Sequence, residues 1–146
     1  MAYFRFIRAN WVFLLAGFLL TFTSAYGQTY FISLFAGEIK GSFGLSDGQW
    51  GGIYTIGTTL SAITMVWAGV LTDRFRVRRL SFWVMVALAG ACLAMAAVPN
   101  WIALIFVIYA LRLTGQGMMS QLGAVAMVRW FEAARGKALS LSSMGF

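Results

Sequence analysis

Arg112 is the residue whose type and position most clearly indicate chemistry. It lies in the apolar run that starts at Trp101, and at about 1.5 Å per residue it is about 16 Å along a core of about 30 Å. A guanidinium stays protonated, and no Asp or Glu occurs inside any of the four long apolar runs of the chain. We expect Arg112 to bind an anionic solute, to couple to a proton, or to bond structurally to backbone carbonyls of a neighbouring helix.

Further polar residues lie at helical spacing within the apolar runs. Gln116 and Ser120 follow Arg112 on the same face, and two other runs each carry a polar face, one of which includes Thr21 and the other Ser61. These groups either line an aqueous cavity or form hydrogen bonds between helices. The candidate substrate-binding or coupling residues are Arg112, Gln116, Ser120, Gln28, Ser24, Tyr54 and Thr58.

Several classes of chemistry are excluded by composition. The chain has no histidine and one cysteine, Cys92, so neither a tetrahedral zinc set nor a disulfide framework is expected. We expect no cofactor. A membrane enzyme would need a nucleophile with a base, a metal set or an acid pair within the spans, and none is present. The net charge of +7 resides in short connectors, without a basic helix face for nucleic acid.

The elements that must position these residues are membrane-spanning helices. Of the 146 residues, 61% are apolar and only 10% are charged, which is far from the composition of soluble domains. Four runs are long enough to cross a bilayer, at residues 10–35, 50–71, 80–98 and 101–128, and a fifth begins at 138–146. The sequence therefore predicts one all-α integral membrane domain over residues 1–146.

Two short segments indicate where helices begin. Ser46 and Gln49 have the spacing of a capping box, which places the start of the second helix near Asp47. The pair Pro99-Asn100 separates the third and fourth runs and predicts a tight hairpin. Gly48 and Gly52 form a small-residue pair that would let another helix approach closely.

The basic residues predict the orientation of the chain. Two precede the first run, four follow the second and three follow the fourth, whereas Lys40 alone lies on the other side. Lys and Arg favour the cytoplasmic side, so the N-terminus is predicted to be inside. A cleaved signal peptide, with small residues at Thr23 and Ala25, is the alternative for the first run.

The connector GVLTDRFRVRRL, residues 69–80, resembles the loop between helices two and three of the major facilitator superfamily. RLTGQG, residues 112–117, is similar to the arginine-and-glycine pattern of the fourth helix in that superfamily. By this resemblance Asp73 would face the N-terminal end of a helix in a second half, where the helix dipole favours an acid. The residues matching the expected gating loop are Gly69, Leu71, Asp73, Arg74, Arg78 and Arg79, and Arg76 stands at a position usually occupied by glycine.

Residues 129–145, RWFEAARGKALSLSSMG, are similar to the branch that includes oxalate/formate antiporters and monocarboxylate carriers. The resemblance implies the first part of the N-terminal six-helix half of a twelve-helix transporter. It would move a small solute, with an organic anion as one candidate, across a bacterial inner membrane by alternating access, with a proton or counter-solute as a candidate partner. A small multi-span membrane subunit that binds a partner protein is the alternative.

Overall fold

The computed structural model describes residues 2–146, with side chains from residue 4 onward, and this part of the chain is helical without any strand. Four segments are long and apolar enough to cross a membrane: Phe4–Gly27, Asp47–Arg74, Val77–Ala96 and Trp101–Trp130. The structure thus confirms an all-α protein with four helices that are long and apolar enough to span a membrane.

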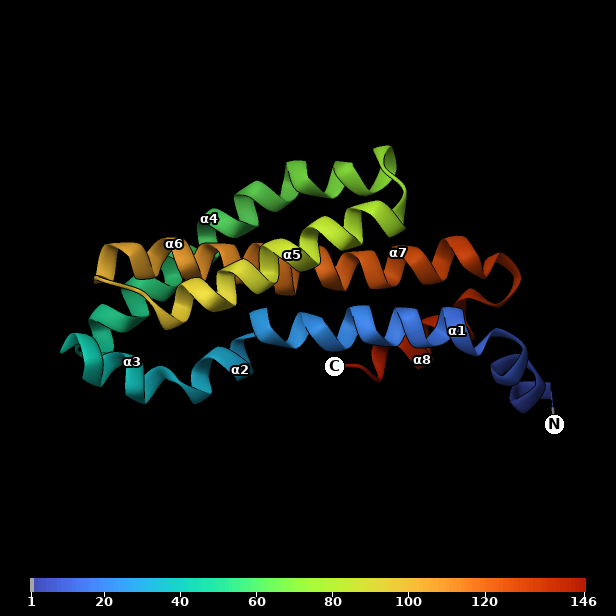
Figure 1. Ribbon diagram of the computed structural model, residues 1–146, viewed down its shortest axis with the longest axis horizontal. Helices are drawn as coiled ribbons and strands as arrows, with labels where there is room; N and C mark the ends of the chain where they lie inside the picture. The colour runs from blue at the N-terminus through green and yellow to red at the C-terminus, as the bar shows by residue number, and fades with distance from the viewer. Residues whose placement is uncertain (1) are drawn as a thin grey trace.

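The fourth span is the centre of the bundle. It packs against the first, second and third spans and against the last helix of the chain. Of its most apolar stretch, 44% is buried, compared with 17–22% in the other three spans. Its side chains supply most of the fully buried core, and Figure 1 shows it running through the bundle as α6 and α7. Residues on the fourth span are therefore the ones held most firmly in place.

The first span differs from the continuous helix expected over residues 10–35. Helix α1 (Ala2–Thr23) bends at Asn10 and is followed by a 3-10 turn, η1 (Ser24–Gly27). Gln28 is extended, and two short helices follow, α2 (Thr29–Leu34) and α3 (Ala36–Phe43), which turn away from the line of α1 in Figure 1. The apolar composition continues through this break, so hydropathy alone could not reveal it.

Helix α4 (Asp47–Arg74) begins as its sequence predicts. The Ser46 hydroxyl accepts a hydrogen bond from the backbone amide of Gln49, and the Gln49 side chain accepts one from the backbone amide of Ser46, which completes the capping box.

The connector to α5 (Val77–Ala96) is tight without a glycine. Arg76 has φ −65° and ψ 129°, a backbone conformation that residues with a side chain adopt freely, so the arginine at this position costs no strain.

The hairpin after α5 also forms where expected. The side chain of Asn100 accepts a hydrogen bond at 2.8 Å from the amide of Ala103 and so caps the next helix. The fourth span is not one regular α-helix, however. It consists of α6 (Trp101–Leu111), an eight-residue π-helix, η2 (Arg112–Met119), and α7 (Ser120–Trp130).

The last segment returns along the bundle. A 3-10 turn, η3 (Glu132–Ala134), leads into α8 (Arg135–Ser143), which begins three residues before the predicted start of the fifth run at 138. Helix α8 packs against α1 and α7. The hydroxyls of Thr21 and Ser142 lie 2.9 Å apart and join α1 to α8 in the buried interface.

Close helix packing uses glycines other than the predicted pair. A Cβ at Gly48 or Gly52 would meet no atom within 4 Å, so these residues mediate no close contact in the described chain. Instead, a Cβ at Gly115 would lie 2.6 Å from the Cα of Gly27. The closest backbone crossing therefore joins the broken part of the first span to the π-helix of the fourth.

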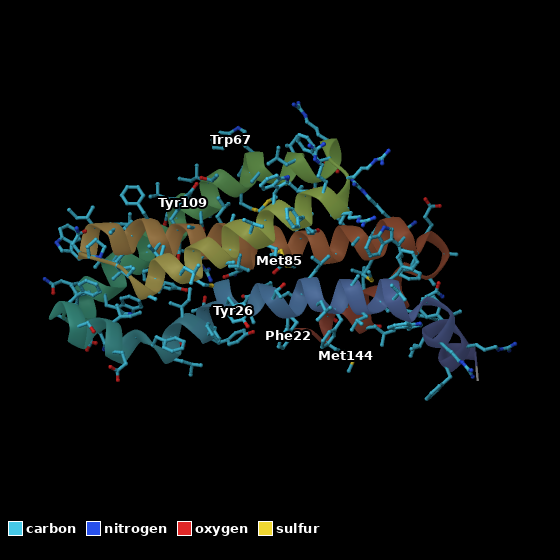
Figure 2. All side chains as sticks on the ribbon, in the orientation of Figure 1. Phe22, Tyr26, Trp67, Met85, Tyr109 and Met144 are labelled. Atoms are coloured by element: carbon cyan, nitrogen blue, oxygen red, sulfur yellow. The ribbon has the colours of Figure 1, made fainter. Side chains whose placement is uncertain are left out.

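The outer faces of the bundle are apolar, as a lipid environment requires. Trp67 projects from the free face of α4 with 68% of its surface exposed (Figure 2). Phe82 and Trp83 are similarly exposed on α5. The polar side chains around Arg112 lie instead at the crossing of the first and fourth spans.

Candidate functional site

The guanidinium of Arg112 is held at the first residue of the π-helix. Its Nη1 donates hydrogen bonds to the hydroxyl of Thr29 at 2.8 Å and to the carbonyl of Gly27 at 3.4 Å. Within the described chain, neither Nη2 nor Nε has a hydrogen-bond partner, and neither is a fully buried atom. The side chain therefore keeps donors free for another molecule.

Tyr54 completes a three-residue cluster around Arg112. Its hydroxyl donates to Thr29 Oγ1 at 3.0 Å, and the Cζ atom of Arg112 lies 5.6 Å from the centroid of its ring. A cation near an aromatic face is attracted by the quadrupole of the ring. Helices α2, α4 and the π-helix each contribute one member, so the cluster fixes the relative positions of three segments of the chain.

Irregular backbone surrounds this cluster on both sides. Gly27 ends the 3-10 turn, Gln28 is extended, and Arg112 starts the π-helix. A Cβ at Gly27 would lie 2.1 Å from the carbonyl oxygen of Leu111, so only glycine permits this approach. Irregular backbone at membrane depth is tolerated where it is buried in protein or lines an aqueous cavity, and π-helices occur frequently at functional sites.

Three other predicted residues present buried polar atoms without a partner. These atoms are Thr58 Oγ1 on α4, Gln116 Oε1 on the π-helix and Ser120 Oγ at the start of α7. Each forms no hydrogen bond with any described residue. Buried polar atoms usually have a partner, so water or a bound molecule is the expected one here.

The predicted polar face of the first span divides into two parts. Ser24 is completely buried and donates to the carbonyl of Thr21 at 2.6 Å, so its hydroxyl is used within the protein. Gln28 is half-buried and lies between Gly27 and Thr29, the two residues that accept hydrogen bonds from Arg112. Gln28 therefore lies beside the cluster, whereas Ser24 is packed inside the protein.

A second polar group lies at one end of the bundle. Asp73, in the last turn of α4, accepts a hydrogen bond from Arg129 near the end of α7, with Nη2 and Oδ1 3.2 Å apart. Nearby, the Gln121 amide donates to the buried hydroxyl of Thr72 at 3.4 Å. Two side-chain contacts therefore link the end of the second span to the fourth span.

The other residues of the expected gating loop flank Asp73 in the sequence. A Cβ added at Gly69 would meet the side chain of Gln121 at an ordinary contact distance of 3.5 Å. The side chains of the loop arginines are exposed, and within the described chain they form no ion pair. They are Arg74, Arg78 and Arg79.

Thr29 and Arg129 are the two partners that sequence reasoning missed. An unbroken helix over 10–35 would direct Thr29 away from Ser24 and Gln28, and only the break after Gly27 turns it toward Arg112. A glycine followed by a polar residue inside an apolar run was the available signal. In the sequence, Arg129 indicates only the orientation of the chain, and its separation from Asp73 by two spans contains no indication of contact.

A cavity of about 930 Å³ opens elsewhere, between α2, α3 and α5. Its lining is mostly apolar, with Glu38 as the charged member, and none of the candidate polar residues contributes to it. The described residues also contain no group of three side chains suited to hold a metal ion. The polar cluster at Arg112 is therefore the strongest candidate site.

The sequence profile described as Major Facilitator Superfamily matches residues 9–146. No curated protein and no solved structure matches the chain significantly.

Proposed function

The chain belongs to the Major Facilitator Superfamily, whose members transport small solutes across membranes, and we propose that it carries a small organic anion recognised by Arg112. Family membership makes the chain a transporter and not an enzyme, and it does not favour the alternative of a partner-binding membrane subunit. The single observation that carries the proposal is the free hydrogen-bonding capacity of a guanidinium near the middle of a span.

Electrostatics supports an anion as the partner. Burying a charge without a counter-charge is costly, and the described spans provide no carboxylate within hydrogen-bonding distance of Arg112. One carbonyl and one hydroxyl satisfy Nη1 but neutralise no charge. Water would solvate the remaining donors in the empty state, and a carboxylate would accept two parallel hydrogen bonds from them in the loaded state.

The polar atoms of Thr58, Gln116 and Ser120 extend the proposed site. Each is buried and has no hydrogen-bond partner among the described residues, and each lies on a helix that contributes to the crossing or adjoins it. Hydroxyl and amide groups of this kind orient a ligand, while the positive charge of Arg112 would supply most of the attraction. Gln28 and Tyr54 complete the proposed lining.

Transport would proceed by alternating access across the inner membrane, with the N-terminus in the cytoplasm. The Asp73–Arg129 pair would act at the cytoplasmic end as part of the gate. Because arginine does not release its proton and the four spans contain no Asp or Glu at membrane depth, we favour exchange against a counter-solute over a proton carried by these spans. The similarity of residues 129–145 to the oxalate/formate and monocarboxylate branch guides the choice of test compounds.

The test is binding of formate, lactate and oxalate to the native protein in detergent, measured by titration calorimetry. Arg112→Lys keeps the charge but loses the planar fork, so it should weaken binding by about tenfold, whereas Arg112→Gln should nearly abolish it. Arg135→Gln is the control, because Arg135 is exposed and contacts only the local backbone. If Arg112→Gln bound these anions as tightly as the wild type, Arg112 would be structural and the anion proposal would be wrong.

A further inference from the structure

Thr29 is the junction of the polar cluster, and its oxygen accepts two hydrogen bonds. One comes from Arg112 Nη1 at 2.8 Å and the other from the hydroxyl of Tyr54 at 3.0 Å. A hydroxyl oxygen has two lone pairs and one hydrogen. Both lone pairs are therefore occupied, and the hydrogen of Thr29 remains the only group with which it can bind another molecule.

The break in the first span explains why this hydrogen is free. Most intramembrane hydroxyls here donate to a carbonyl three or four residues earlier, as Thr64 does to Leu60 at 2.9 Å and Thr114 does to Ala110 at 2.7 Å. Thr29 is the first residue of α2 and follows extended Gln28. The carbonyl of Ala25, four residues earlier, accepts instead from the amide of Gln28 at 2.9 Å.

We propose that Thr29 is a positioning and specificity-determining residue of the solute site. It holds the guanidinium through Nη1, which leaves Nη2 and Nε to the solute, and it donates its own hydrogen to the same anion. This role rests on the proposed function of Arg112 as the anion-binding residue. It also extends that function, because Thr29 can offer a ligand only a donor and so favours a carboxylate, in which both oxygens accept, over a neutral amide, whose NH2 group cannot accept.

The geometry makes the proposal testable without threatening the fold. The side chain of Thr29 is exposed in the described chain, so replacing its hydroxyl by a methyl group leaves no buried cavity. Valine has nearly the same shape as threonine and lacks only the hydrogen-bonding group. Serine keeps that group and lacks the methyl.

Thr64 provides a matched control. It also accepts a hydrogen bond from a tyrosine, with the hydroxyl of Tyr109 donating at 3.1 Å. Its own hydrogen, however, is used by the carbonyl of Leu60, and it has no arginine partner. Thr64→Val therefore removes a similar interhelical hydrogen bond without touching the proposed anion site.

The experiment measures dissociation constants of lactate and of its neutral analogue lactamide for the native protein and its variants in detergent. Thr29→Val should weaken lactate binding by roughly tenfold or more, the effect of losing a donor to a charged acceptor. The ratio of lactate to lactamide affinity should fall with it. Thr29→Ser should restore both values to within about threefold of wild type, and Thr64→Val should leave both unchanged.

The outcomes separate this inference from the proposed function. If Thr29→Val bound lactate as the wild type does while Arg112→Gln lost it, the role of Thr29 would be wrong and the anion site would stand. The role of Thr29 would also be wrong if Thr29→Ser bound as weakly as Thr29→Val, because the methyl group would then be the important part. If neither Arg112→Gln nor Thr29→Val changed binding, or if no carboxylate bound the wild type, the proposed function itself would fail.

Discussion

At the scale of single residues, the contact between Asp73 and Arg129 contributes little to the stability of the fold, and the role proposed for it is in the gate. The side chain of Asp73 is 78% exposed and that of Arg129 is 38% exposed. Exposed ion pairs contribute about 0 to 1 kcal/mol to stability. The carboxylate of Asp73 also keeps an oxygen free for a second partner, such as the helix end that the family resemblance implies.

Asp73→Asn should therefore lower transport while membrane insertion and thermal stability stay close to wild type. The substitution keeps the shape of the side chain and removes the charge that attracts Arg129 and any second partner. Initial uptake rates in cells, normalised to protein level, measure the effect. Glu132→Gln is the control, since Glu132 is an exposed acid of the next connector. Normal uptake by the Asp73 variant would contradict a gating role.

The residue types alone identified Arg112 and Tyr54 because charges and hydroxyls are scarce in apolar runs. They could not identify Thr29. Its partnership with both residues depends on a backbone break that apolar composition does not encode. Sequence reasoning therefore located the centre of the candidate site and missed the group that connects it to the first span.

At the scale of elements, the crossing of the first and fourth spans depends on two glycines in contact. A Cβ at Gly115 would lie 2.6 Å from Gly27 Cα and 2.7 Å from Gly27 N, both of which are backbone atoms that cannot move aside independently. The crossing places the carbonyl of Gly27 within hydrogen-bonding distance of Arg112. The packing of the first span against the fourth and the position of the Gly27 carbonyl at Arg112 therefore depend on the same contact.

Gly115→Ala should separate the two backbones and destabilise the protein by about 1 to 3 kcal/mol, the usual cost of overpacking. Its melting temperature in detergent should fall. Gly90→Ala on α5 is the matched control, because a Cβ there meets no atom within 4 Å. Alanine is the better helix former, so this control should be as stable as wild type or slightly more stable. Equal melting temperatures for the Gly115 variant and wild type would disprove the crossing.

The number and the order of the spans followed from the sequence, and so did the cap at Ser46 and the hairpin at Pro99-Asn100, because hydropathy, capping and helix breaking are local properties. The 3-10 turn after Thr23 and the π-helix at Arg112 did not follow. Both arise where two backbones meet, and no local pattern specifies which glycine of one span will contact which glycine of another.

At the scale of the whole molecule, the charged connectors gather at one end of the bundle. Figure 1 places the N-terminus, the turn between α4 and α5 and the turn after α7 at the same end, with the turn between α5 and α6 at the other. The first three contain nine of the eleven basic residues of the chain. The fold therefore agrees with the alternation of basic and non-basic connectors along the chain, and the positive-inside rule predicts that this end is cytoplasmic.

The orientation predicts which residues are accessible from outside an intact cell. Ser42, on α3, and Ala133, in the turn after α7, are both exposed, and Figure 1 shows these two elements at opposite ends of the bundle. In a Cys92→Ala background, Ser42→Cys should react with a membrane-impermeant maleimide in intact cells, and Ala133→Cys should react only after permeabilisation. The physical reason is that Lys and Arg in short connectors keep those connectors on the cytoplasmic side during insertion. Labelling of position 133 but not position 42 in intact cells would reverse the orientation, and the Asp73–Arg129 pair would then lie at the outer face, where it could not form a cytoplasmic gate.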